Sequence, residues 1–381
     1  MSRRVVITGL GVCAPNGVGL ADFTQSLKEG KSGIRHQPIL EKLGFGCQIA
    51  GEPLVKDNRI DDYFTPLERR GLNATGIVYG VIAGVDAWKD AGLEGNVTEE
   101  PCWERGILFG TGILGVDKFR EAIHLIDEGN VRRLGSTSVI QTMASGISAY
   151  LGGLLGCGNQ VTTNSAACTT GTEGIIMAYD RISQGKAEIM LTGSCSDSGP
   201  YVWGGFDAMR ILPRAYNNNP SQASRPMSAS ASGFIPGSGA GALVLESLES
   251  AQNRGTHIYA EVLGGEINSG GQLGEGSMTA PNSIAVQRCI RNAILNSGIK
   301  ANEVDVIIMP SVDALEIENW SKALNRSGKD FPYINSFKGS IGHCLAAAGS
   351  IESVATILQF QEQVVFKNVN CDDIHTEIQS L

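Results

Sequence analysis

The sequence lacks the features that would assign it to a membrane or to a nucleic acid. None of its apolar stretches reaches the length of a membrane span, and Met1-Ser2-Arg3-Arg4 runs straight into a strand pattern without the apolar core of a secretory signal. Basic residues form no stripe, and the net charge is −9, which argues against phosphate binding. We therefore expect a cytoplasmic protein that binds neither a membrane nor a nucleic acid.

Paired cysteines and clustered metal ligands are missing as well. The nine cysteines are odd in number and scattered, and no two of them have the close CxxC spacing of a zinc site. The five histidines are just as dispersed: His36, His124, His257, His343 and His375. This pattern favours a reducing compartment, and it suggests no metal and no organic cofactor.

Glycine and short apolar runs are abundant instead. With 381 residues, 42% of them hydrophobic, and 49 glycines, the chain can bury one large core or two fused ones. Runs rich in Val and Ile alternate with Ala-rich helical stretches, which is typical of an α/β layered fold with buried strands. The pattern predicts strands at 5–8, 106–109, 189–192, 242–245 and 306–309, helices at 67–91, 171–185 and 346–361, and loop-rich segments at 30–63 and 199–231.

One cysteine stands where a helix is expected to begin. Cys168 lies among small residues in the run 163–174, and backbone N–H groups at a helix N-terminus favour the thiolate, which attacks thioesters. A free cysteine is more often a buried core residue, so a second observation is needed. The segment 335–349 supplies it, because it places Lys338 and His343 five residues apart. The sequence thus holds both a nucleophile and a candidate base.

At these two segments the sequence resembles the β-ketoacyl synthases, the condensing enzymes of fatty-acid and polyketide assembly in the thiolase superfamily. Further matches keep the family's order over nearly the whole chain, at 4–12, 106–112, 223–226, 232–246 and 278–281. The resemblance implies an α/β fold, a thiolase-like five-layered α-β-α-β-α sandwich of two duplicated halves. Residues 1–250 would form the half with the nucleophile-position cysteine, and residues 251–381 the half with the Lys/His motif.

The resemblance also implies roles for four residues. Cys168 would be the nucleophile, and His343 one of two histidines that assist decarboxylation of a malonyl carrier. Lys338, paired with Glu352, would organise the site, although such a pair also fits a buried ion pair that only holds the architecture. The reaction needs acyl transfer to the thiolate and then attack by a carbanion, both supported by oxyanion-binding N–H groups.

The sequence departs from the family's pattern at three places. The family's other histidine belongs to a His-Gly-Thr-x-Thr motif, but Pro310 or its neighbour stands there, and proline offers no side-chain donor and no backbone N–H. At two positions where the family's glycine-rich motifs have acidic residues, this sequence has serines instead, Ser232 and Ser238. The sequence ends at Leu381, before a Gly-Phe-Gly-Gly loop that in the family supplies a gating phenylalanine and an oxyanion N–H. Either it is incomplete or the site lacks this part.

These departures favour a ketosynthase-like subunit with a degraded active site. It would be similar to the chain-length factors that form a heterodimer with an active ketosynthase in type II polyketide or aryl-polyene pathways, where the partner helps to define the acyl tunnel. Retention of Cys168 counts against this hypothesis, because many chain-length factors replace that cysteine. Two alternatives stay open: an active β-ketoacyl synthase with an incomplete Cys-His-His triad, performing decarboxylative Claisen condensation, and a non-catalytic acyl-binding homodimer.

An acyl carrier protein is the second partner that the resemblance implies. Carrier proteins are usually acidic, as this chain is, so docking requires a local basic patch. The candidates are Arg69-Arg70, Arg132-Arg133, and Arg210 with Arg214, and solvated surface charge explains each of them equally well.

Overall fold

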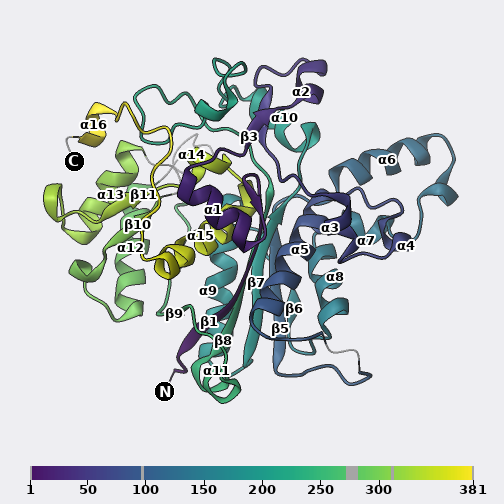
Figure 1. The fold of residues 1–381 in the computed structure, drawn as a ribbon, viewed down its shortest axis with the longest axis horizontal. Coiled ribbons are helices and arrows are strands. Elements are labelled where there is room, and N and C mark those ends of the chain that lie inside the picture. The colour runs from purple at the N-terminus through teal and green to yellow at the C-terminus, as the bar shows by residue number, and fades with distance from the viewer. Residues whose placement is uncertain (1, 96–97, 272–281, 310–312, 380–381) are drawn as a thin grey trace.

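The computed structural model describes residues 2–95, 98–271, 282–309 and 313–379 (Figure 1). Two positions of interest, the segment 278–281 and Pro310, lie outside the described residues.

A mixed sheet forms the centre of the molecule, and in the described part of the chain it has seven strands. Its order is β2-β1-β8-β7-β5-β6, and β9 also pairs with β1. β5 is parallel to β6 and β7, whereas β8 is antiparallel to β1 and β7. Every residue of β1, β7 and β8 is buried, as expected for a sheet covered on both faces. The strands are β1 (Val5–Ala14), β2 (Gly17–Val18), β5 (Arg105–Thr111), β6 (Val161–Thr162), β7 (Ile189–Ser196), β8 (Gly239–Ser247) and β9 (Ala260–Val262).

Helices pack closely on both faces of this sheet. α5 (Thr75–Asp90) and α8 (Gly146–Leu155) cover one face, and α9 (Thr170–Ser183) and α15 (Ala348–Glu362) cover the other. Glycine permits this approach: a Cβ on Gly11 would lie 2.0 Å from the Ala83 carbonyl oxygen in α5, and one on Gly241 would lie 2.5 Å from the Ile351 backbone nitrogen in α15. Because both contacts are with backbone, a side chain at either position would push a helix off the sheet.

Two further layers complete a five-layered sandwich. The parallel strands β10 (Val306–Ile308) and β11 (Tyr333–Asn335) lie beyond α9 and α15, and α12 (Ser283–Ser297) and α13 (Ala314–Leu324) cover them (Figure 1). Ile308 packs against the cluster that contains Ile351 of α15, and Ile307 packs with Ile317 of α13. The fold is the expected thiolase-like α-β-α-β-α arrangement. Its halves are unequal, since the second sheet has two strands in the described residues.

Most of the elements predicted from the sequence are confirmed. The five predicted strands fall on β1, β5, β7, β8 and β10, and two of the predicted helices are α9 and α15. The predicted helix 67–91 is confirmed over α5 but is wrong in its first part, because α4 (Pro66–Arg69) ends before α5 begins at Thr75. Arg70 is extended and Gly71 is left-handed, with φ of 78°, so the helix cannot continue through them.

The two segments predicted as loops contain short elements. The first holds the antiparallel pair β3 (Ile34–His36) and β4 (Ile49–Gly51), with α2 (Pro38–Lys42) and α3 (Asp57–Asp61). The second holds α10 (Pro200–Ala208), which the prediction missed because the adjacent Gly204 and Gly205 disfavour a helix. The segments pack on each other, and the Asp207 carboxylate accepts hydrogen bonds from the N–H groups of Gly46 and Cys47.

The remaining helices connect these layers. They are α1 (Leu20–Glu29), α6 (Val116–Asp127), α7 (Ser138–Thr142), α11 (Leu248–Arg254), α14 (Lys338–Ile341) and α16 (Thr376–Gln379). The predicted boundary at residue 250 falls inside α11 and stays a prediction. Within the described ranges, no helix combines the length and the apolar character that crossing a membrane requires.

Candidate active site

Cys168 lies on a tight turn at the start of α9. The turn is a single 3₁₀ element, η2 (Ala167–Thr169), and Ala167 has a φ of 50°, in the left-handed region that L-residues disfavour. The buried Thr170 hydroxyl stabilises the turn, because it accepts from the Ala166 N–H at 2.8 Å and donates to the Ala167 carbonyl at 2.7 Å. Cys168 itself is exposed. The structure thus places the thiol at a helix start, as the sequence predicts.

A cavity of about 260 Å³ opens beside this thiol. Its walls come from the ends of β5 and β7, from α10, and from two turns that precede α9 and α15. The lining is mainly apolar, with polar groups at Ser165, Ser196 and Asp197. The lining residues are Gly112, Ile113, Ser165, Ala167, Cys168, Ser196, Asp197, Val202, Phe206, Leu345 and Ala346. An apolar chain attached to or near the thiol fits such a cavity.

Lys338 and Glu352 form a buried ion pair between α14 and α15. The Lys338 ammonium donates to the Glu352 carboxylate, and the two side chains are only 7% and 10% exposed. Each charge alone would be costly at this depth, so each residue depends on the other. The pair therefore holds the Lys338 ammonium at one position between α14 and α15.

His343 stands just after α14 and is neutral at pH 7. Its Nδ1 accepts from the Leu345 N–H at 3.1 Å, which places the ring proton on Nε2. Burial and, secondly, the Lys338 charge lower the pKa of His343 to about 3. The ring contacts Phe234 at 5.1 Å between centroids, and Phe234 contacts Phe206 of the cavity wall at 5.4 Å. His343 can therefore donate a hydrogen bond from Nε2 but does not supply a charge.

The electrostatics at Cys168 differ from the simple expectation for a helix start. Although Cys168 has exposed surface, partial desolvation by the surrounding protein raises the pKa of its thiol, while the charge of Lys338 and the residue's own N–H lower it. The net shift of the pKa is upward, because the loss of hydration destabilises the thiolate more than these two groups stabilise it. Lys338 is thus the charged group that favours the Cys168 thiolate.

Asp197 is a cavity residue that the sequence reasoning missed. Its carboxylate accepts from the Gly76 N–H at the start of α5, at 2.6 Å, and from the N–H groups of Gly115 and Val116 at the start of α6. Burial raises its pKa to about 6, against the opposing effect of these N–H groups. Asp197 ties two helix starts to the end of β7. An acidic residue directly after a buried strand is the only signal in the sequence that could have found it.

The structure also locates the positions where the sequence departs from the β-ketoacyl synthase pattern. Ser238 is buried, and its N–H donates to the Gly51 carbonyl at 2.9 Å, whereas Ser232 is exposed. All five histidines lie in the described ranges. His36 pairs with Glu41, His257 packs on Tyr259, His375 donates its N–H to the Met227 carbonyl, and His124 is on α6. None of these three contacts involves a residue that lines the cavity, and His124 is not a lining residue either.

The basic candidates are not equivalent. Arg69 forms ion pairs with Asp57 and Asp61, which offset its charge. The other members of the candidate patches are exposed: Arg70, Arg132, Arg133, Arg210 and Arg214. Among the described residues, no group of three or more His, Cys, Asp or Glu is arranged to hold a metal ion.

A thiol on a strained turn beside a mainly apolar cavity, in a thiolase-like sandwich, is an arrangement suited to acyl thioesters. Known families agree with this class. The model of the "Beta-ketoacyl synthase, N-terminal domain" matches residues 2–251, and that of the "Beta-ketoacyl synthase, C-terminal domain" matches residues 259–372. The chain belongs to the β-ketoacyl synthase family and is a ketosynthase-type protein of chain elongation.

Individual relatives cover nearly the whole chain. The 3-oxoacyl-[acyl-carrier-protein] synthase 2 of Vibrio harveyi is 33% identical over 97% of this chain and 89% of its own length. The ishigamide ketosynthase/chain length factor superposes with a TM-score of 0.84 at 25% identity, over 99% of this chain and 91% of that one. The AntDE:AntF complex, a type II polyketide synthase acyl carrier protein with its ketosynthase, superposes with a TM-score of 0.84 at 28% identity, over 99% and 91%.

Proposed function

We propose that this chain is a ketosynthase-like subunit of fatty-acid or polyketide elongation that acts as a chain-length-factor-like partner of an active β-ketoacyl-ACP synthase. The observation that carries the proposal is the missing second histidine, since His343 is the one histidine whose contacts lead to the cavity wall. The likeness to the ishigamide ketosynthase/chain length factor supports the same assignment.

The chemical reason is the loss of one donor. Decarboxylation of a malonyl thioester leaves negative charge on the thioester oxygen, which the family stabilises with two histidines. Here the Nε2 proton of His343 is one donor. Pro310, which stands at or next to the position of the family's other histidine, supplies none. Losing a single oxyanion donor typically slows an enzyme by about 10²–10³-fold. A subunit with this defect can still shape the acyl tunnel of its partner, with Ile113, Val202 and Phe206 as the wall.

A second candidate function is favoured by Cys168 itself. The thiol is exposed at the cavity, and the Lys338 charge opposes the desolvation that raises its pKa. As an active β-ketoacyl-ACP synthase, the chain would use the Cys168 thiolate to attack the carbonyl of an acyl carrier thioester. The carbon–sulfur bond to the carrier would break, and the carrier thiolate would leave and take up a proton. The third alternative, an acyl-binding homodimer, keeps the cavity without this chemistry.

Both functions require an acyl carrier protein, which we propose as the partner that delivers the acyl group in the cytoplasm. The type II carrier that is bound to its ketosynthase in the AntDE:AntF complex is a protein of this class. Arg132 with Arg133, and Arg210 with Arg214, are the exposed basic pairs that suit an acidic partner. Neither function calls for a metal or an organic cofactor.

The decisive experiment is intact-protein mass spectrometry of the chain alone after incubation with acyl carrier thioesters, with Cys168→Ser as control and malonyl carrier added afterwards. The proposal expects no condensed product unless an active ketosynthase is added. Acyl mass on Cys168 that is discharged by malonyl carrier would establish the active synthase instead. A stable dimer of the chain alone that holds an acyl group without reacting would establish the homodimer. Pro310→His tests the missing histidine, and a large gain in malonyl decarboxylation is the expected result.

A further inference from the structure

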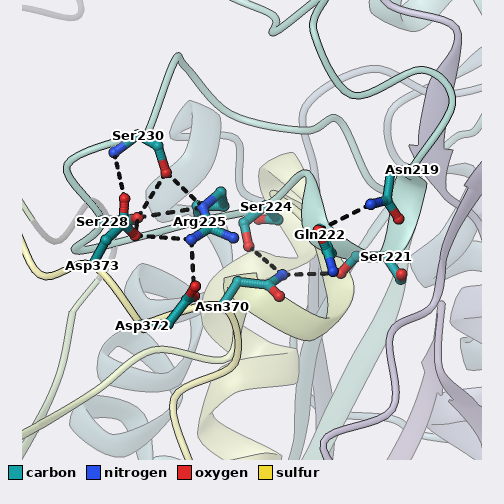
Figure 2. Close-up of polar contacts among 10 residues, drawn as sticks. All are labelled: Asn219, Ser221, Gln222, Ser224, Arg225, Ser228, Ser230, Asn370, Asp372 and Asp373. Atoms are coloured by element: carbon teal, nitrogen blue, oxygen red, sulfur yellow. Dashed lines mark hydrogen bonds and ion pairs between the residues drawn. The ribbon is translucent and has the colours of Figure 1, made fainter.

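The segment 366–379, called the strap below, lies against the loop 219–232. Arg225 joins them, because its Nη2 contacts Asp372 Oδ1 and Asp373 Oδ1 at 2.8 Å each (Figure 2). The Arg225 side chain is 9% exposed, whereas that of Asp372 is 78% exposed. Asp373 also accepts from the Ser228 hydroxyl and from the Ser230 N–H. An arginine held in protein thus clamps two carboxylates of the strap.

Backbone contacts extend this clamp along the strap. The Ala229 N–H donates to the Asp373 carbonyl at 2.6 Å, and the His375 N–H donates to the Met227 carbonyl at 2.9 Å. The Asn370 amide donates to the carbonyls of Ser221 and Ser224 at 2.9 Å each (Figure 2). Strap and loop therefore form one connected unit around Arg225.

This unit touches the turn that carries Lys338 from two sides. From the loop, the buried Ser224 hydroxyl donates to the Lys338 carbonyl at 2.6 Å. From the strap, the Asn368 side-chain oxygen accepts from the Ser336 N–H at 2.9 Å. The strap also packs on the next residue, since a Cβ on Gly339 would lie 2.6 Å from the Val369 carbonyl oxygen. The backbone from Ser336 to Gly339 is thus held by both parts that Arg225 joins.

We propose that Arg225 is a positioning residue of the candidate site: by clamping the strap to the loop, it fixes the turn that places the Lys338 ammonium near Cys168. The clamp lies outside the cavity, and no residue of it lines the wall. The relevance of the clamp for chain elongation rests on the proposed function, whereas the clamp and its effect on the thiol do not.

A displacement of the Lys338 ammonium would change its electrostatic interaction with the ionisable groups around it. They are Glu352 on α15, His343 and Cys344 after α14, and Cys168 before α9. Because the interaction between charges weakens with separation, a loosened Lys338 turn lowers the pKa of Cys168 less than the clamped one. The exposed thiol then reacts only at higher pH, because the thiolate is the reactive form.

The test is the pH profile of Cys168 alkylation by iodoacetamide, resolved by peptide mass spectrometry in the full-length chain. We expect Arg225→Gln and Asp373→Asn to raise the midpoint by about 0.5 pH unit, which is about threefold slower alkylation below it. Arg225→Lys keeps the charge but not the forked geometry, so its shift should be smaller. Asp330→Asn is the matched control, since it removes the Arg326–Asp330 ion pair, whose Asp330 side chain is 74% exposed and whose two residues belong to neither the strap nor the loop.

The outcomes separate positioning from simple stabilisation. Equal midpoints in wild type and Arg225→Gln would overturn the proposal, even if thermal stability fell. A wild-type Cys168 that is not alkylated, an equal shift in Asp330→Asn, or no smaller shift in Arg225→Lys would overturn it as well. Asp373→Asn keeps the side-chain volume and carries the test if Arg225→Gln does not fold. Since iodoacetamide replaces the acyl group, the result is independent of whether the chain elongates anything.

Discussion

Two turns with the same backbone form face each other across the cavity, one from each half of the fold. The first turn is η2, which begins at Ala167 with a φ of 50° and leads into α9. The second is the 3₁₀ turn η6 (Leu345–Ala347), which begins at Leu345 with a φ of 52° and leads into α15. Cys168 and Ala346 occupy the corresponding second positions, and both line the cavity. Cys168 is exposed, whereas Ala346 is 2% exposed. The two halves thus share the same backbone conformation at these turns, but only the first turn presents a reactive atom, the Cys168 sulfur.

The polar support of the two turns differs in charge. Before the first turn, the Asn164 amide donates to Glu173 of α9 at 2.8 Å. Before the second, the Lys338 ammonium donates to Glu352 of α15. The half that carries the Cys168 thiol therefore has an uncharged donor, Asn164, and the other half has a charged one, Lys338. The Lys338 charge lowers the pKa of Cys168, while the pairing with Glu352 holds the ammonium in place.

Removing the two donors is the strongest way to break this comparison. Lys338→Met leaves the buried Glu352 carboxylate unpaired, and we expect a loss of about 3–5 kcal/mol in the free energy of unfolding. Asn164→Leu removes the hydrogen bonds that the uncharged Asn164 amide donates to the partly buried Glu173 and to the Thr170 carbonyl, and a smaller loss of about 1–2 kcal/mol is expected. Urea unfolding followed by circular dichroism measures both. The double variant Lys338→Met/Glu352→Leu should recover most of the loss, and equal losses in the two single variants would contradict the comparison.

The repeated turn shows where sequence reasoning succeeds and where it stops. The Val- and Ile-rich runs and the Ala-rich stretches predict the strands and α9 and α15, because these elements are set by local burial and periodicity. The resemblance selects Cys168, Lys338, His343 and Glu352. Of these, Cys168 lines the cavity, Lys338 pairs with Glu352, and His343 contacts Phe234, which packs on Phe206 of the cavity wall. The repeat of η2 in η6 is invisible in the sequence, since Ala167 and Leu345 share a φ but not a residue type. Asp197 was missed because its partners are backbone N–H groups far away in the chain.

Acid stability tests the second turn, because His343 stands three residues before Ala346. Its pKa is about 3 in the folded chain and about 6.5 in the unfolded chain, so the unfolded chain binds the proton first as the pH falls. Stability is fully present above pH 6.5 and declines toward pH 3, by about 3 kcal/mol at pH 4. His343→Gln should remove this part of the decline in urea unfolding measured between pH 7 and pH 4. An unchanged slope in the variant would show that His343 is not held neutral by the fold.

Asp197 should act in the opposite direction over much of the same range. Its folded pKa of about 6 exceeds the ordinary value of 3.8, so the folded chain binds this proton more tightly than the unfolded chain. Its charge therefore costs stability above pH 6, and this cost is relieved as the pH falls, by about 2 kcal/mol at pH 4. Asp197→Asn should make the acid decline steeper than in wild type, by the same unfolding measurement. The matched control is Asp313→Asn, an exposed carboxylate that accepts from a helix-start N–H but lies outside the cavity. A decline that steepens equally in the control would contradict the assignment to Asp197.

Glycine at the two left-handed positions should give effects of opposite sign. At Ala167, glycine relieves a strain of about 1–2 kcal/mol and costs about 0.5–1 kcal/mol of chain entropy, so a small net stabilisation of about 0.5–1 kcal/mol is expected. At Leu345, the same relief is outweighed by the loss of a side chain that packs with Leu40, Val202 and Trp203 and lines the cavity. Thermal unfolding of Ala167→Gly and Leu345→Gly, each beside wild type, measures the difference. Destabilisation by Ala167→Gly would contradict this expectation. It would mean that the Ala167 Cβ stabilises the first turn, as the Leu345 side chain stabilises the second.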